Sequence, residues 1–252
     1  MKIITLNLKA QYKKGRAFLK LIAVILLVVL AAKITVSVYA SSDVYTETLS
    51  EITEKSTVII DAGHGGEDCG AIGVNGVYEK DLNFSIANTL GDMLSKNGYA
   101  VVYTRTSDAL LYTESENIYG IRKISDLKNR CKLGAEYSNA IYISIHMNSY
   151  KSPECDGLQV YYSNENDSTR RLGLEVQNAV KAKLQPKNNR KIKNGDGIYL
   201  LENLKNPAIL IECGFLTNPI ECENLIKKEY QKELCSAIFY GIIEYIAKET
   251  NR

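Results

Sequence analysis

Short apolar runs alternate with segments of helical periodicity along the chain from Thr57 onward. Apolar runs of strand length cover residues 57–61, 100–105, 140–145 and 208–213, and residues 157–163 alternate between apolar and polar. Apolar residues at helical spacing predict helices over 80–97, within 117–137, and over 168–184 and 229–248, with another beginning at Asn218-Pro219. Wholly apolar strands that alternate with helices predict an α/β fold with a largely parallel sheet in a single domain.

The first 40 residues have a different pattern. They contain seven basic residues and no acidic one, and Leu21 to Ala32 is an unbroken apolar run of twelve. A basic flank before such a run is typical of an export signal. A membrane-spanning helix needs about 20 apolar residues, although Lys20 and Lys33 can snorkel and lengthen the run. We therefore expect residues 1–40 to be either a cleaved signal peptide, ending near Val38-Tyr39-Ala40, or a retained membrane anchor.

The rest of the chain is expected outside the cytoplasm, either secreted or anchored to the membrane. Residues 41–56 are polar and predict a linker, and residues 57–250 predict one well-buried domain. Without the seven N-terminal cations, 24 Lys and Arg face 29 Asp and Glu. This acidic balance, without a basic stripe after residue 40, argues against nucleic acid as a partner.

Six cysteines lie in the exported region, and no two of them form a C-x-x-C pair. A cysteine-based zinc site therefore has no support. A disulfide framework and free thiols are both compatible with an exported domain. Because Cys213 lies in an apolar strand and Cys131 and Cys235 in helical patterns, we expect small core residues with free thiols and no catalytic thiol.

His64 and His146 are the only histidines, and each follows or ends a predicted strand. Strand ends are typical places for functional side chains, because the sheet fixes the residue while the next loop leaves it accessible. A zinc hydrolase needs three imidazole or carboxylate ligands, one open position and a nearby general base. With two imidazoles, the third ligand must be a carboxylate. Spacing alone leaves open the carboxylates near His64, which are Asp61, Glu67, Asp68 and Glu79.

Four blocks, in order, resemble those of the zinc-dependent N-acetylmuramoyl-L-alanine amidases. They are DAGHGG at 61–66, EKD at 79–81, SIHMN at 144–148 and LIECGFLTNP at 210–219. The resemblance implies a mixed, mostly parallel sheet flanked by helices, and peptidoglycan as the substrate. It also implies zinc on His64, Glu79 and His146, with Glu212 as the catalytic carboxylate.

Residues 122–130 and 197–203 resemble the spore-cortex, germination-specific branch of that family. This likeness implies that the enzyme prepares muramic acid for muramic-δ-lactam formation, with the forespore intermembrane space as a location. A helper protein that supports zinc loading or activity is a further hypothesis. The alternatives are a vegetative autolysin, a zinc carboxypeptidase and a non-catalytic wall-binding module. The carboxypeptidase is disfavoured because its H-x-x-E ligands lie three apart, whereas His64 and Glu79 lie fifteen apart.

Three further polar residues have open roles at this stage. Asn148 either shapes the turn after His146 or binds substrate. Arg105 and Arg130 either contact anionic wall polymer or, as we favour, have solvated or structural roles.

Overall fold

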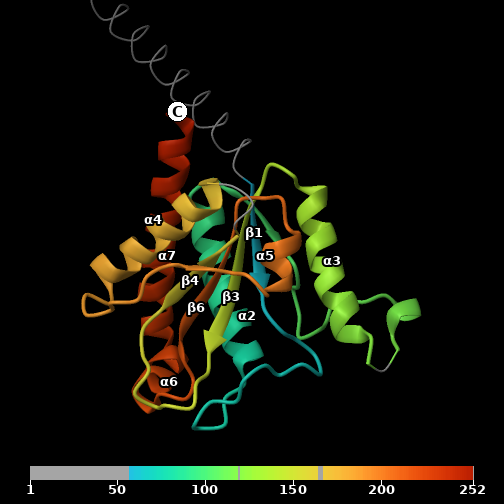
Figure 1. Ribbon diagram of the computed structural model, residues 1–252, viewed down its shortest axis with the longest axis horizontal. Coiled ribbons are helices and arrows are strands. Elements are labelled where there is room, and N and C mark those ends of the chain that lie inside the picture. Colours follow the sequence, from blue (N-terminus) through green and yellow to red (C-terminus); the bar gives the residue numbers. More distant parts are fainter. Residues whose placement is uncertain (1–56, 119, 164–166, 252) are drawn as a thin grey trace, which may run out of the picture. The chain divides into compact units, whose positions relative to one another are not determined.

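The computed structural model describes residues 57–118, 120–163 and 167–251 (Figure 1). The signal peptide or anchor predicted for residues 1–40 and the linker predicted for 41–56 lie outside the described residues. Within the described ranges, no helix combines the length and the apolar character that crossing a membrane requires.

One six-stranded sheet forms the centre of the domain, with the strand order β2-β1-β3-β6-β4-β5. Four neighbouring strands pair in parallel, and they are β2 (Ala100–Tyr103), β1 (Thr57–Ala62), β3 (Ile141–Asn148) and β6 (Ala208–Phe215). Strand β4 (Gln159–Tyr162) is antiparallel to β6, and β5 (Lys193–Asn194) is parallel to β4. The expected mixed, mostly parallel sheet is confirmed.

Helices cover both faces of this sheet (Figure 1). One face packs against α2 (Glu79–Lys96), α4 (Asp167–Lys183) and α7 (Lys228–Thr250), in the larger apolar core. The other face packs against α3 (Arg122–Glu136) and α5 (Tyr199–Asn203), in a smaller core around Tyr142 and Leu210. Helix α6 (Pro219–Ile226) begins where the Asn218 side chain accepts hydrogen bonds from two backbone amides, which explains its start at Asn218-Pro219.

The sequence pattern missed three features of the fold. Strand β5 has two residues and α5 has five, too few for a hydrophobic period to show. Strand β3 also extends to Asn148, three residues beyond its apolar run, because His146 and Asn148 continue the ladder with β6. His146 therefore lies within a strand and not after it. The carboxyl ends of β1, β3 and β6 meet at one edge, where ligands bind in sheets of this kind.

Candidate functional site

Three side chains that are distant in sequence converge at this edge of the sheet. Nε2 of His64 lies 3.2 Å from Oε1 of Glu79, and Nδ1 of His146 lies 3.0 Å from the same oxygen. One ligand atom from each residue lies within 4.8 Å of the others. The two ring centroids are 5.0 Å apart with the rings at 70°. The structure thus brings together the three residues predicted as metal ligands.

Glu79 is the first residue of α2 and is 4 % exposed. Its carboxylate accepts hydrogen bonds from the backbone amides of Ala71, at 2.8 Å, and Met147, at 3.0 Å. Burial acts to raise the pKa of Glu79, but the imidazoles of His146 and His64 outweigh it and hold that pKa well below its usual range. Glu79 is therefore a fixed, charged carboxylate and not only a helix-capping acid.

The loop that carries His64 requires unusual backbone geometry. His64 has a φ of 61°, in the left-handed region that a residue with a Cβ rarely adopts. Its neighbour Gly63 packs directly on the other imidazole, because a Cβ there would lie 2.1 Å from Nε2 of His146. A glycine is therefore needed at position 63, because any side chain there would displace the imidazole of His146.

Two buried arginines hold this loop through its carbonyl groups. Arg130 donates to the carbonyl oxygens of Ala62 and His64, each at 2.9 Å. Arg105 donates to those of Ala62, at 2.9 Å, and Gly63, at 3.3 Å. Their side chains are 1 % and 5 % exposed respectively, so a structural role is confirmed for both and contact with a wall polymer is not. Such backbone donation offsets part of the strain at His64.

Asp61, a candidate third ligand on spacing alone, lies instead under the loop. It pairs with Arg130 and accepts hydrogen bonds from Ser144 and, at 2.8 Å, from Thr104. Burial acts to raise the pKa of Asp61, but Arg130 and these hydrogen bonds hold it below its usual range. Asp61 is therefore committed to this buried network and is not a member of the three-residue cluster.

Asp68 approaches His64 from the side opposite Glu79. Its Oδ2 lies 2.9 Å from Nδ1 of His64 and 3.1 Å from Nζ of Lys123. Burial acts to lower the pKa of His64, but Asp68 and Glu79 outweigh it and raise that pKa to about 9. The sequence pattern placed Asp68 among the ligand candidates. In the structure, Asp68 instead contacts Nδ1 of His64, the outer nitrogen, which faces away from Glu79. Glu67 points elsewhere and pairs with Arg122.

Glu212, the predicted catalytic carboxylate, is the direct partner of His146 in the ladder between β3 and β6. Its Oε2 is buried and has no hydrogen-bond partner among the residues that the structure describes. Burial, reinforced by Glu79 and opposed by His146 and His64, raises the pKa of Glu212 to about 7. A buried carboxyl oxygen without a partner is costly and is typical of a functional group.

The cysteines take no part in this cluster. All six are free thiols, and Cys213, Cys222 and Cys235 are buried. Burial raises the pKa of Cys131 to about 11 and that of Cys235 to about 12, which leaves neither thiol reactive at neutral pH.

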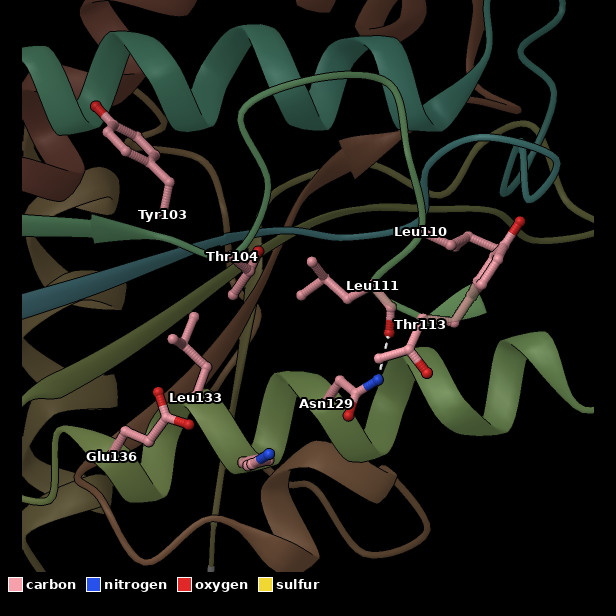
Figure 2. A pocket seen from close by; sticks show the side chains of 10 residues that line it. Tyr103, Thr104, Leu110, Leu111, Thr113, Asn129, Leu133 and Glu136 are labelled. Atoms are coloured by element: carbon pink, nitrogen blue, oxygen red, sulfur yellow. Dashed lines mark hydrogen bonds between the residues drawn. The ribbon is translucent and has the colours of Figure 1, made fainter. Parts of the chain in front are cut away.

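A larger cavity, of about 390 Å³, lies away from the histidines, between α3 and the segment from Leu110 to Thr113 (Figure 2). There Asn129 donates a 2.7 Å hydrogen bond to the carbonyl oxygen of Leu111, drawn as a dashed line. None of the four predicted site residues lines this cavity. A small cavity of about 50 Å³ lies beside His64 and His146, and Asp61 and Arg130 also line it.

Known proteins match nearly the whole described domain. Residues 58–244 match the family model described as N-acetylmuramoyl-L-alanine amidase. The chain is 36% identical over 192 residues to the germination-specific N-acetylmuramoyl-L-alanine amidase of Bacillus subtilis (strain 168), which covers 76% of this chain and 80% of the relative.

Two solved structures have the same fold. The CwlD amidase of Clostridioides difficile, solved in complex with the GerS lipoprotein, superimposes with a TM-score of 0.73 at 35% identity, covering 76% of this chain and 98% of that one. An N-acetylmuramoyl-L-alanine amidase of Clostridium difficile 630 gives a TM-score of 0.68 at 34% identity. The match covers 77% of this chain and 98% of that one.

Proposed function

This chain belongs to the N-acetylmuramoyl-L-alanine amidase family, and from that membership we propose that it hydrolyses its peptidoglycan amide with a zinc ion held by His64, Glu79 and His146. The bond is the one between the lactyl group of N-acetylmuramic acid and L-alanine. Its hydrolysis leaves a carboxylate on the sugar and a free amine on the stem peptide.

The side chains present fit a catalytic zinc site. Two imidazole nitrogens and one carboxylate oxygen are the donor set of many such sites, and three protein ligands leave a position open. Neighbouring groups fix the orientation of two of the three ligand side chains. The backbone amide of Met147 donates to Glu79, and the carboxylate of Asp68 faces Nδ1 of His64. Carboxylates in that second position orient a ligating histidine and strengthen its binding.

When bound, zinc supplies a Lewis acid that promotes ionisation of water and polarises the amide carbonyl. The proton transfers are then the work of Glu212, which lies beside the cluster without being one of its members. Its carboxylate accepts the proton of the attacking water and delivers it to the nitrogen of the leaving L-alanine. In the metal-free protein, burial raises the pKa of Glu212 to about 7, so its ionised and protonated forms are both accessible near neutral pH.

One observation carries this proposal: two imidazoles meet one buried carboxylate, and a second carboxyl without a hydrogen-bond partner lies on the next strand. Digestion of peptidoglycan with the purified protein tests it. We expect new L-alanine amino termini without new reducing sugar ends. Free C-terminal amino acids would instead identify a carboxypeptidase, and binding without release would identify a wall-binding module.

The biological setting of this activity is also a proposal. The germination-specific relative supports a role in the spore cortex, where removal of the peptide prepares muramic acid for δ-lactam formation. This role requires that the protein is exported, for example into the forespore intermembrane space. The exported protein is either secreted or anchored to the membrane through residues 1–40. Spores of a deletion strain should then lack muramic-δ-lactam; normal lactam content would favour a vegetative autolysin.

A helper protein is consistent with the CwlD amidase, which was solved with a lipoprotein bound. We extend this to the present chain as a proposal. Zinc content and peptidoglycan hydrolysis of the purified chain, measured with and without a lipoprotein from the same organism, test it. Full zinc loading and unchanged activity in the absence of the lipoprotein would contradict it.

A further inference from the structure

A second cavity, of about 380 Å³, lies next to Glu212 along the sheet. Its lining includes Gln159 and Tyr161 of β4 and Asn148 of β3. Gln159 is the direct ladder partner of Glu212, and Asn148 lies two positions beyond His146 on the same strand. Side chains of paired residues project from the same face of a sheet. The cavity therefore begins on the strand next to Glu212, and neighbouring strand backbones lie about 4.8 Å apart.

The charged side chains that line this cavity are all positive. Arg190 and Lys193 line it, and no acidic side chain does. Neither cation forms an ion pair with the residues that the structure describes. A cationic cavity beside a catalytic group favours an anionic part of the substrate.

Arg190 is held in place by neutral partners. Its Nε donates to the carbonyl oxygen of Asp156 at 2.7 Å, and its Nη1 donates to Oε1 of Gln159 at 2.9 Å. The guanidinium also stacks on Phe215, 4.5 Å from the ring centroid. These contacts use two of the three guanidinium nitrogens, and neither hydrogen bond is to a carboxylate. A fixed guanidinium with unused donors is well suited to bind a carboxylate.

The two sides of the scissile amide differ in charge. On the sugar side, the lactyl carboxyl of muramic acid is consumed in the amide, so the sugar carries no carboxylate there. The stem peptide on the other side carries carboxylates beyond the L-alanine. Two residues of extended peptide span about 7 Å, which is more than the spacing of about 4.8 Å between neighbouring strands.

We propose that the cavity around Arg190 and Lys193 is the subsite for a carboxylate of the stem peptide, with Arg190 as its specificity-determining residue. The subsite directs the peptide toward β4 and leaves the sugar on the side of α3. This inference rests on the proposed function, because it assumes that the muramoyl–alanine amide is cleaved at the histidine cluster.

The test compares two forms of one peptidoglycan preparation: one with free stem carboxyls and one with these carboxyls amidated by carbodiimide coupling to ammonia. For the wild-type protein we expect kcat/KM to fall about tenfold or more on amidation, mainly through KM. For Arg190→Gln, kcat/KM should fall by a similar factor on the free-carboxyl form and change little on the amidated form. Arg190→Lys should recover part of the preference.

The matched control is Lys191→Gln, which removes a neighbouring exposed cation outside the cavity lining and should retain the wild-type preference. Equal hydrolysis of the two forms by the wild-type protein would overturn the subsite, as would an equal loss on both forms in Arg190→Gln. If the wild-type protein releases no L-alanine amino termini from either form, the proposed function fails, and the subsite fails with it.

Discussion

Glu212 lies directly opposite His146 in the ladder between β3 and β6, so the predicted base and one predicted ligand project from the same face of the sheet. The pairing of β3 with β6, and not the conformation of a loop, fixes the position of Glu212 relative to His146. It places the carboxyl of Glu212 beside the three-residue cluster without making it a member. A general base needs this position, because it must reach the water without occupying a ligand site.

Replacement of Glu212 by Gln should separate zinc binding from catalysis. We expect Glu212→Gln to bind zinc as the wild-type protein does and to lose about 10²- to 10⁴-fold in turnover, because the amide cannot accept the proton. Elemental analysis and release of L-alanine amino termini measure the two effects. His146→Ala should lose both zinc and turnover, and Glu223→Gln, at an exposed position of α6, should lose neither. Retained hydrolysis in Glu212→Gln would refute the role of this carboxylate.

The same substitution should stabilise the metal-free protein at neutral pH. The pKa of Glu212 is raised by burial from 4.5 to about 7, so its contribution to stability is present below the unfolded pKa and is lost as the pH rises through the folded pKa. Metal-free Glu212→Gln should therefore unfold with a free energy on the order of 3 kcal/mol above wild type at about pH 8, and with little difference at about pH 4. Urea denaturation at the two pH values measures this. A difference independent of pH would contradict the assigned pKa.

Asp68 should act on zinc affinity and not on turnover. Its Oδ2 lies 2.9 Å from the outer nitrogen of His64, so Asp68→Asn weakens the orientation of that ring. We expect zinc affinity to fall about 10- to 100-fold, with turnover at saturating zinc nearly unchanged. Competition with a chelator measures the affinity. Glu67→Gln is the control, since Glu67 pairs with Arg122 and contacts neither imidazole; an equal loss in both variants would contradict the role of Asp68.

Arg130 should be a major determinant of stability. The pKa of its guanidinium is raised by Asp61 and Asp126 despite burial, and its removal leaves Asp61 charged and 0 % exposed. Arg130→Met should lower the free energy of unfolding by about 3–5 kcal/mol. Arg170→Met, at an exposed position of α4, should change it by less than about 0.5 kcal/mol. Urea denaturation measures both variants. A loss below about 1 kcal/mol in Arg130→Met would show that the ion pairs of Arg130 with Asp61 and Asp126 are not needed for stability.

The sequence predicted the long elements because each has a strong apolar period, as Leu82, Ile86, Leu90 and Leu94 show in α2. It also predicted the convergence of His64 and His146, since parallel strands end at one edge. It did not predict Arg105 and Arg130 as supports of the His64 loop, because their partners are backbone carbonyls distant in sequence. The spacing of Asp126 and Arg130 by one helical turn was a signal only for a local pair.

The sequence also did not predict the proposed subsite around Arg190. Arg190 precedes β5, a two-residue strand without a pattern of its own. Its place beside Glu212 depends on β4 running antiparallel to β6, a pairing that no local period encodes. Asn148, left open between a turn and a substrate contact, ends β3 and lines the same cavity.

The central claim is that one zinc ion is held by two imidazoles and one carboxylate, with a second carboxylate left free. Anomalous diffraction at the zinc edge from crystals of the zinc-loaded protein tests it most directly. We expect one peak at about 2.0–2.2 Å from nitrogen atoms of His64 and His146 and from an oxygen of Glu79, with Glu212 uncoordinated. No peak at this cluster, or zinc bound at other residues, would contradict the account.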